Sequence, residues 1–67
     1  MTAKLLKDIK AGEYFTRKPI EEPNEKQVFI KRDYVRSDKK YICERFSDIN
    51  DYIELKGNTT VYIDFYF

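Results

Sequence analysis

Cys43 is the one residue of the sequence that carries a thiol, the strongest nucleophile among common side chains. A thiol attacks as its thiolate and needs a neighbouring base or positive field to form it, yet the chain contains no histidine to act as that base. Cys43 alternates with Tyr41 in the segment KKYICERF, which places both on the inner side of an expected strand. We therefore predict a packed thiol. With one cysteine and no histidine, the chain forms no internal disulfide and no zinc site of the usual Cys and His type, which fits a reducing compartment.

The carboxylates of the second half are candidates for a hydrolase pair or for a Mg²⁺ or Ca²⁺ site, because these cations take oxygen ligands. These residues are Asp48, Asp51, Glu54 and Asp64. Their spacing matches no metal loop, and Glu21, Glu22 and Glu25 lie beside two prolines with no Gly turn to wrap a cation. The sequence also lacks a Gly-rich phosphate loop and a Ser with a base. We predict solvated acids, no metal, no cofactor, no catalytic residues and no enzymatic activity.

Residues 31–45 carry six basic against three acidic side chains, a net charge of +3, in a chain whose overall net charge is +1. The basic residues are Lys31, Arg32, Arg36, Lys39, Lys40 and Arg45. With Phe29, Tyr34 and Tyr41 close by, such a basic strand surface is the kind of platform that binds single-stranded nucleic acid. Alternatively, cross-strand charge pairs keep an exposed hairpin soluble and protect its edge. The interspersed acids favour this second interpretation, because they weaken the attraction for phosphate.

Aromatic residues make up 16% of the chain, and several tyrosines are expected to point outward. The candidates are Tyr14, Tyr52, Tyr62 and Tyr66. Such side chains often anchor protein interfaces, because each offers a large apolar area and a hydroxyl group. Alternatively, they complete a second small cluster under the proline-rich loop. The first interpretation predicts a non-enzymatic interaction module that binds a protein partner, or a second copy of itself, through a barrel face or a strand edge.

The elements that position these residues are read from the alternation of apolar and polar side chains. Residues 2–10 allow one amphipathic helical turn or an irregular segment, and residues 13–18 form a first strand with Phe15 on one face and Tyr14 and Thr16 on the other. A loop follows at 19–26, where both prolines lie. Residues 27–35 and 39–46 form a hairpin. The elements of this hairpin carry all six basic candidates.

In the strand 27–35, we expect Val28 and Ile30 on one face, and Tyr34 is a further candidate for that face. Residues 47–55 fit either a short helix or a strand, and we favour the strand because of its β-propensity and of the turn chemistry of Gly57 and Asn58.

The last segment, residues 59–67, has the clearest strand pattern. Its apolar face is formed by Val61, Ile63, Phe65 and Phe67, which alternate with two tyrosines and an aspartate. Such a strand would invite aggregation at an open edge, so we expect it to be paired, with this face turned inward. Residues 1–67 are thus predicted to form a single all-β domain, a small five-stranded SH3-like or OB-like barrel with at most one short helical turn.

Three segments of the chain resemble a known group of sequences. DIKAGEYF, VFIKRDYVRSDKKYICERFSDIN and ELKGNTTVYIDFYF are similar to short uncharacterised proteins of gut-type bacteria and of their phages and mobile elements. The shared pattern runs Asp, apolar, Lys, x, Gly, acid, Tyr, Phe and closes on Val-Tyr-x-Asp-Phe-x-Phe, so that the resemblance spans Asp8 to Phe67. It implies a small barrel, and it transfers no activity and no site residue.

The expected compartment and partners follow from charge and hydropathy. The near-neutral charge gives no global attraction to nucleic acid or to an anionic membrane. The apolar stretch of MTAKLLKDIK is too short for a signal peptide, and no run approaches the length of a membrane span. We therefore expect a cytoplasmic protein with a protein partner, possible nucleic-acid binding and no membrane contact.

Overall fold

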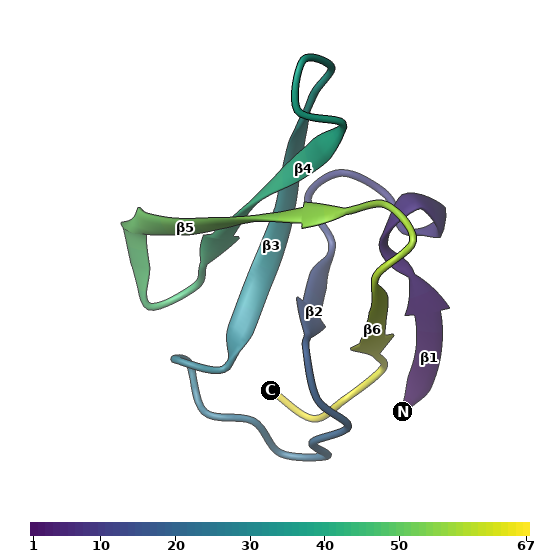
Figure 1. Ribbon diagram of the computed structural model, residues 1–67. Coiled ribbons are helices and arrows are strands. Elements are labelled where there is room, and N and C mark those ends of the chain that lie inside the picture. Colours follow the sequence, from purple (N-terminus) through teal and green to yellow (C-terminus); the bar gives the residue numbers. More distant parts are fainter.

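The computed structural model describes residues 1–67, apart from the side chain of Ile49, and folds as six antiparallel strands in one sheet (Figure 1). The elements are β1 (Thr2–Leu5), the 3-10 turn η1 (Leu6–Asp8), β2 (Tyr14–Thr16), β3 (Val28–Val35), β4 (Lys40–Arg45), β5 (Asp48–Lys56) and β6 (Thr60–Ile63). The strand order is β1-β6-β2-β3-β4-β5, and β1 does not pair with β5, so the sheet is not closed. The predicted all-β class is confirmed.

Residues 2–10, for which one helical turn or an irregular stretch is expected, contain both a strand, β1, and a helical turn, η1. β1 pairs with β6 from Thr2, opposite Ile63, to Leu5, opposite Thr60, which raises the number of strands from the expected five to six. Helical structure is confined to η1. The N–H of Lys7, in the middle of η1, donates to the Gly57 carbonyl at 3.0 Å and so links η1 to the β5–β6 turn. Within the part of the chain that the structure describes, no helix has the length and apolarity needed to cross a membrane.

β3 and β4 form the predicted hairpin, whose tip extends beyond the rest of the sheet (Figure 1). The connecting turn has no glycine, and Lys39 takes the left-handed conformation there with φ of 53°. A bulge between Lys31 and Tyr34 shifts the register, so that Tyr34 pairs with Tyr41. Tyr34 consequently lies on the face opposite to that of Val28 and Ile30, and the expectation that it shares their face is wrong.

β5 settles the choice between helix and strand for residues 47–55 in favour of the strand. Ile53 pairs with Cys43 and Leu55 with Tyr41, so both aliphatic side chains point to the buried side of the sheet. At its start the strand shifts register, because Arg45 pairs with Asp48. β5 forms one edge of the sheet, and in the view of Figure 1 it passes in front of β3 and β4.

The last strand is shorter than predicted. β6 ends at Ile63, because Asp64 turns the chain with φ of 61° and its carboxylate accepts a hydrogen bond from the Thr2 hydroxyl at 2.9 Å. The chain beyond it leaves the strand direction, and Phe67 is 56% exposed. The expectation that one apolar face runs inward from Val61 to Phe67 is therefore wrong for its last residue. β6 joins β2 through a single register pair, Thr16 with Tyr62.

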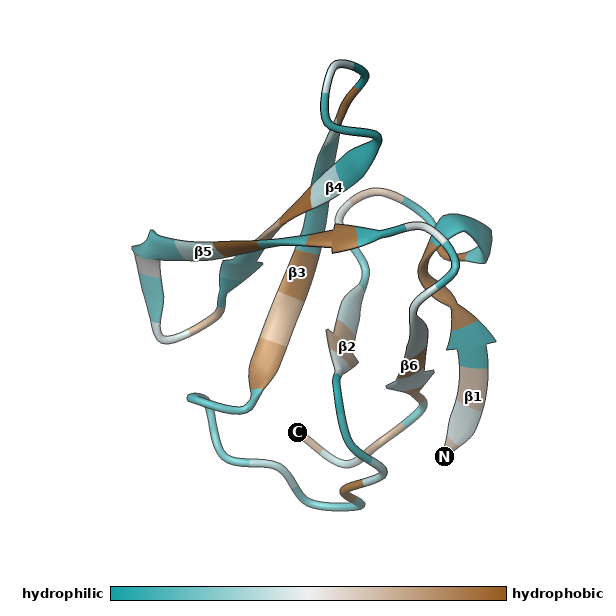
Figure 2. Cartoon of the chain, viewed as in Figure 1, coloured by the Kyte–Doolittle hydropathy of each residue, from teal (hydrophilic) through white to brown (hydrophobic). Residues whose placement is uncertain are grey.

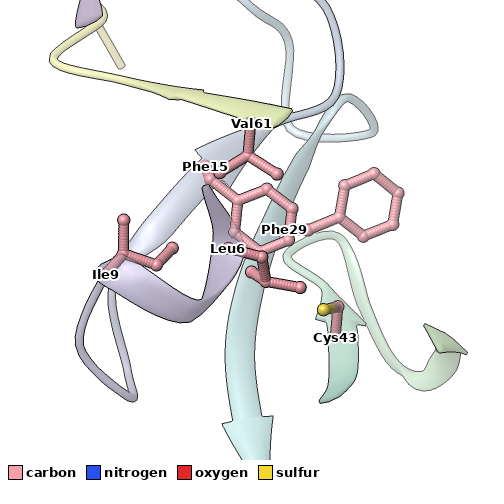
Figure 3. Packing of buried hydrophobic residues seen from close by; sticks show 6 residues of the cluster. All are labelled: Leu6, Ile9, Phe15, Phe29, Cys43 and Val61. Carbon is pink, nitrogen blue, oxygen red and sulfur yellow. The ribbon is translucent and has the colours of Figure 1, made fainter. Parts of the chain in front are cut away.

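The core lies on one side of the curled sheet, which we call the core face. It consists of Leu6, Ile9, Phe15, Phe29, Cys43 and Val61, which point toward one another in Figure 3. The rings of Phe15 and Phe29 stack with centroids 5.9 Å apart, and η1 with the residue after it supplies two aliphatic side chains as the lid. Each such buried side chain stabilises the fold by about 1.5 to 3 kcal/mol. Figure 2 shows how the apolar stretch of β3 gives way to a hydrophilic hairpin tip.

Candidate functional site

Exposed aromatic rings gather on the face of the sheet opposite the core, which we call the outer face. Tyr14 lies there because it alternates with the buried Phe15 in β2. Phe46 follows β4, and its N–H donates to the Val28 carbonyl at 2.9 Å, which holds it beside β3. Phe67 reaches the same place because the turn at Asp64 redirects the C-terminal segment. Three rings from distant parts of the sequence thus meet.

These three residues, Tyr14, Phe46 and Phe67, form the aromatic patch. The rings of Phe46 and Phe67 meet edge to face with centroids 4.8 Å apart, and Tyr14 lies 5.5 Å from Phe46 and 6.2 Å from Phe67. Edge-to-face pairs of this kind contribute about 0.5 to 1.5 kcal/mol beyond their buried area. The residues nevertheless remain 44%, 36% and 56% exposed, respectively. The patch is an ordered apolar surface that water still reaches.

A buried row lies on the same outer face. Thr16 pairs with Val28 and Tyr14 with Ile30, so the alternation directs all four side chains to this side. Thr16 and Val28 are fully buried and Ile30 is 8% exposed, although none belongs to the main core cluster. The outer face therefore carries a second, thinner apolar layer beside the patch.

The other candidate tyrosines occupy separate places. Tyr52 is 57% exposed and pairs with Glu44 across β4 and β5. Tyr62 is half-buried in β6. Tyr66 is 76% exposed, and its N–H donates to the Glu21 carbonyl at 2.8 Å, which ties the C-terminal segment to the proline-rich loop. Among the described side chains, Tyr14 stacks with phenylalanines and with none of these tyrosines.

Three of the six basic candidates of the hairpin, Lys31, Arg32 and Arg45, are either buried or paired with a carboxylate. Lys31 is 5% exposed, and its ammonium group donates to the Ile9 carbonyl at 2.5 Å. Arg32 pairs with Glu44 at 3.2 Å. The alternation of residues in the sequence does not predict that Lys31 is buried. Its burial depends on the segment around η1, which covers the side chain and supplies the Ile9 carbonyl as its acceptor.

Arg45 is the most constrained of these three. It pairs with Asp51 at 2.7 Å, donates to the Lys26 carbonyl and lies 4.9 Å from the centre of the Phe29 ring. These contacts brace the start of β3 against the loop that precedes it. The guanidinium is thereby committed to the fold.

The remaining three basic candidates, Arg36, Lys39 and Lys40, lie at the hairpin tip. Lys40 pairs directly with Lys56 across β4 and β5, and like charges opposite each other destabilise a sheet. On the other face, the core side of the hairpin, the rings of Tyr34 and Tyr41 meet at a tilt with centroids 4.8 Å apart, and Tyr34 is 46% exposed. The tip therefore carries cations on one face and a pair of rings on the other.

The buried thiol and the buried ammonium group lie side by side in neighbouring strands. Burial raises the pKa of the Cys43 thiol to about 11, although the positive charges of Lys31 and Arg17 oppose this shift. Burial also lowers the pKa of Lys31 from its usual value, against the negative charges near it, among them Glu13 and Asp8. At neutral pH the thiol is therefore protonated, fully buried and a poor nucleophile, as the sequence predicts for a packed cysteine.

The acidic residues show no arrangement that could hold a metal ion. Among the residues whose side chains are described, no group of three or more Cys, Asp or Glu side chains gathers closely enough to do so. Asp51 is engaged with Arg45, and Asp64 accepts the Thr2 hydroxyl. These two carboxylates therefore serve local structure.

Comparison of the chain with protein-family models, with curated proteins and with solved structures gives no match. The resemblance to short proteins of gut bacteria and phages thus stays a prediction. The site is defined by its own geometry, and its main features are the aromatic patch and the hairpin tip. Sequence reasoning found Tyr14 but missed Phe46 and Phe67, because alternation assigned them to strands that end before reaching them.

Proposed function

We propose that the protein is a non-enzymatic interaction module that binds a protein partner through the outer face of its sheet. The observation that supports this best is the aromatic patch, whose three rings hold one another in place and stay between 36% and 56% exposed. Rings lose little conformational entropy on binding and bury a large apolar area, so they are frequent anchors of protein interfaces.

The chemistry of the chain supports binding rather than catalysis. Its one thiol is protonated at neutral pH and buried in the core. The buried Lys31 ammonium group serves the fold, since it donates to the Ile9 carbonyl and lies 4.3 Å from the centre of the Tyr41 ring. The thiol and this ammonium group are thus both enclosed.

We also infer that the sheet belongs to the SH3-like or OB-like class of small barrels. In support, η1 bridges the opening between the edges, because its first two N–H groups donate to carbonyls of the β5–β6 turn at 2.9 and 3.0 Å. We also propose that the protein is cytoplasmic and that it comes from gut bacteria or from their mobile elements.

The experiment is selection of a displayed library of short random peptides on the folded protein. We expect peptides that bind the wild type and lose at least about tenfold in affinity on the variant Phe67→Ser, because the variant removes an exposed anchor. Tyr34→Ser is the matched control, since Tyr34 is exposed to a similar degree but lies on the other side of the sheet. Its affinity should equal that of the wild type.

Sedimentation of the protein without peptide tests whether the patch binds a second copy of the protein. A dimer that Phe67→Ser dissociates would identify self-association as the use of the patch. Selected peptides that bind wild type and Phe67→Ser equally, together with a monomer at high concentration, would refute the proposal.

A second candidate function is accessory binding of single-stranded nucleic acid by the hairpin 31–45. The specific observation that favours it is the hairpin tip, where Lys40 lies opposite Lys56 on one face and the rings of Tyr34 and Tyr41 meet on the other. A phosphate between the two lysines would relieve their repulsion, and the exposed Tyr34 ring on the other face offers a surface on which a base can stack.

Titration with labelled single strands and duplexes tests this candidate. At low salt we expect single strands to bind more tightly than duplexes, and the affinity should fall as the salt concentration rises. The variant Lys40→Gln should weaken binding, whereas the control Arg32→Gln, whose guanidinium is already paired with Glu44, should have a smaller effect. Absence of salt-sensitive binding would exclude the candidate.

A further inference from the structure

A groove of about 380 Å³ lies where β2 leaves the sheet and β3 enters it. Its lining residues are Arg17, Lys18, Ile20, Gln27 and Phe29. Phe29 points to the core face, whereas the aromatic patch lies on the outer face, so the groove and the patch are separate sites. A volume of this size is at the lower end of the range for ligand sites, which is roughly 300 to 1,000 Å³.

The walls of the groove are held by hydrogen bonds. The Lys18 carbonyl accepts the Thr16 hydroxyl at 2.6 Å and the Ile20 N–H at 2.9 Å, which fixes the chain as it leaves β2. The Phe29 ring is held by two neighbours, because it stacks with the Phe15 ring and the Arg45 guanidinium lies 4.9 Å from its centre. The groove is therefore shaped before any ligand arrives.

The polar side chains of the groove are all hydrogen-bond donors. Arg17 and Lys18 are exposed cations, and among the described side chains neither pairs with a carboxylate. Gln27 adds a third donor, because its carbonyl oxygen already accepts the Asn24 N–H at 3.0 Å and only its NH₂ group is left for a ligand. The rest of the lining, Phe29 and Ile20, is apolar.

A complementary ligand must offer acceptors and a negative charge next to an apolar group. We propose that the groove binds the C-terminal carboxylate of a peptide whose last side chain is apolar. The carboxylate accepts from Arg17, Lys18 and the Gln27 NH₂ group, and the last side chain lies on Phe29 and Ile20. Arginine suits a carboxylate because its planar fork makes two parallel hydrogen bonds. The groove is open to the surface, so the remainder of the peptide leaves toward solvent.

The test uses hexapeptides that end in Leu, Phe or Val, each with a free carboxyl group and as its C-terminal amide, titrated into isotope-labelled protein. We expect the free acids to shift the backbone NMR signals of Arg17, Lys18 and Gln27, and the amides to bind at least about tenfold more weakly. Arg17→Gln should reduce affinity for the free acid by a similar factor. Arg36→Gln is the matched control, because it removes the same charge at the hairpin tip, and it should leave the affinity unchanged.

Equal binding of acids and amides would overturn the inference, as would equal losses in Arg17→Gln and Arg36→Gln, or no shift at millimolar peptide. Phe67→Ser separates this inference from the proposed function. If Phe67→Ser abolishes binding of these peptides and Arg17→Gln does not, the patch is the binding site and the inference about the groove fails alone.

Discussion

Lys31 and Cys43 lie directly opposite each other on β3 and β4, both on the core face and both buried. Gly12 and Glu13 enforce this position, because the Lys31 carbonyl accepts the Gly12 N–H at 2.7 Å and the Lys31 N–H donates to the Glu13 carbonyl at 3.1 Å. Lys31 lies two residues after Phe29 in β3, so its side chain points to the core face as the Phe29 ring does. Burial raises the pKa of Cys43 and lowers the pKa of Lys31, so the two residues should change the stability of the protein in opposite directions as the pH rises.

Cys43 should make the protein less stable in alkali. In the unfolded chain the thiol ionises near its ordinary pKa of 9.0, whereas in the folded protein its pKa is about 11. Between these values the folded state holds more protons, so the free energy of unfolding falls as the pH rises. Relative to Cys43→Ala, the wild type should lose on the order of 2 kcal/mol across this interval. Urea denaturation at a series of pH values measures the loss. Parallel curves for the two proteins would contradict the expectation.

Lys31 should act in the opposite sense. Burial lowers its pKa below the ordinary 10.5, so with rising pH the folded protein releases this proton before the unfolded chain does. In that interval the unfolded state holds more protons, and the free energy of unfolding of the wild type should rise relative to Lys31→Met. Lys31→Arg is the control, because its charge does not titrate in this range, and it should lack the rise. A constant difference between wild type and Lys31→Met at all pH values would refute this assignment.

A buried phenylalanine of β2 and the exposed phenylalanine at position 67 should differ in their effect on stability. Phe15→Ala removes a fully buried ring and should cost about 3 to 5 kcal/mol, enough to unfold much of a domain of this size. Phe67→Ala removes a ring that is 56% exposed and should cost about 1 kcal/mol or less. Thermal denaturation followed by circular dichroism compares them. If Phe67→Ala were as damaging as Phe15→Ala, the C-terminal ring would belong to the core.

Backbone conformation sets the outcome at Gly12 and Lys39. A Cβ at Gly12 meets no atom within 4 Å, so Gly12→Ala tests only the φ of 90°, and it should cost about 1 to 2 kcal/mol. Lys39 already takes φ of 53°. Lys39→Gly relieves that strain but frees the unfolded chain, so its net effect should be near zero. Chemical denaturation measures the free energy of unfolding of both variants. No loss of stability in Gly12→Ala would show that the loop can adopt another backbone conformation at this position.

Strand positions were predictable where apolar and polar residues alternate without interruption. The hairpin and the burial of Cys43 followed from this two-residue period, and the strand nature of residues 47–55 followed from β-propensity and from the turn chemistry of Gly57 and Asn58. What escaped prediction depends on single residues that break the period. The bulge before Tyr34 and the turn at Asp64 each move the later residues to the other face or off the sheet, and neither involves a glycine or proline.

The candidate site was less predictable than the fold, because its members meet only after these interruptions. Tyr14 was identified from its alternation with Phe15, but Phe46 and Phe67 join it through a backbone bond to Val28 and a turn at Asp64. The groove likewise requires the proline-rich loop to bring Arg17, Lys18 and Ile20 beside Gln27 and Phe29, which no local pattern specifies.

The pairing of β1 with β6 also governs the order of events during synthesis. Among the six strands, β1 is synthesised before the others and its partner β6 after them, whereas β2 to β5 pair in the order in which they are made. A nascent chain stalled before Thr60 would therefore present an unpaired β1 beside the β2 to β5 meander, a state that a chaperone can bind.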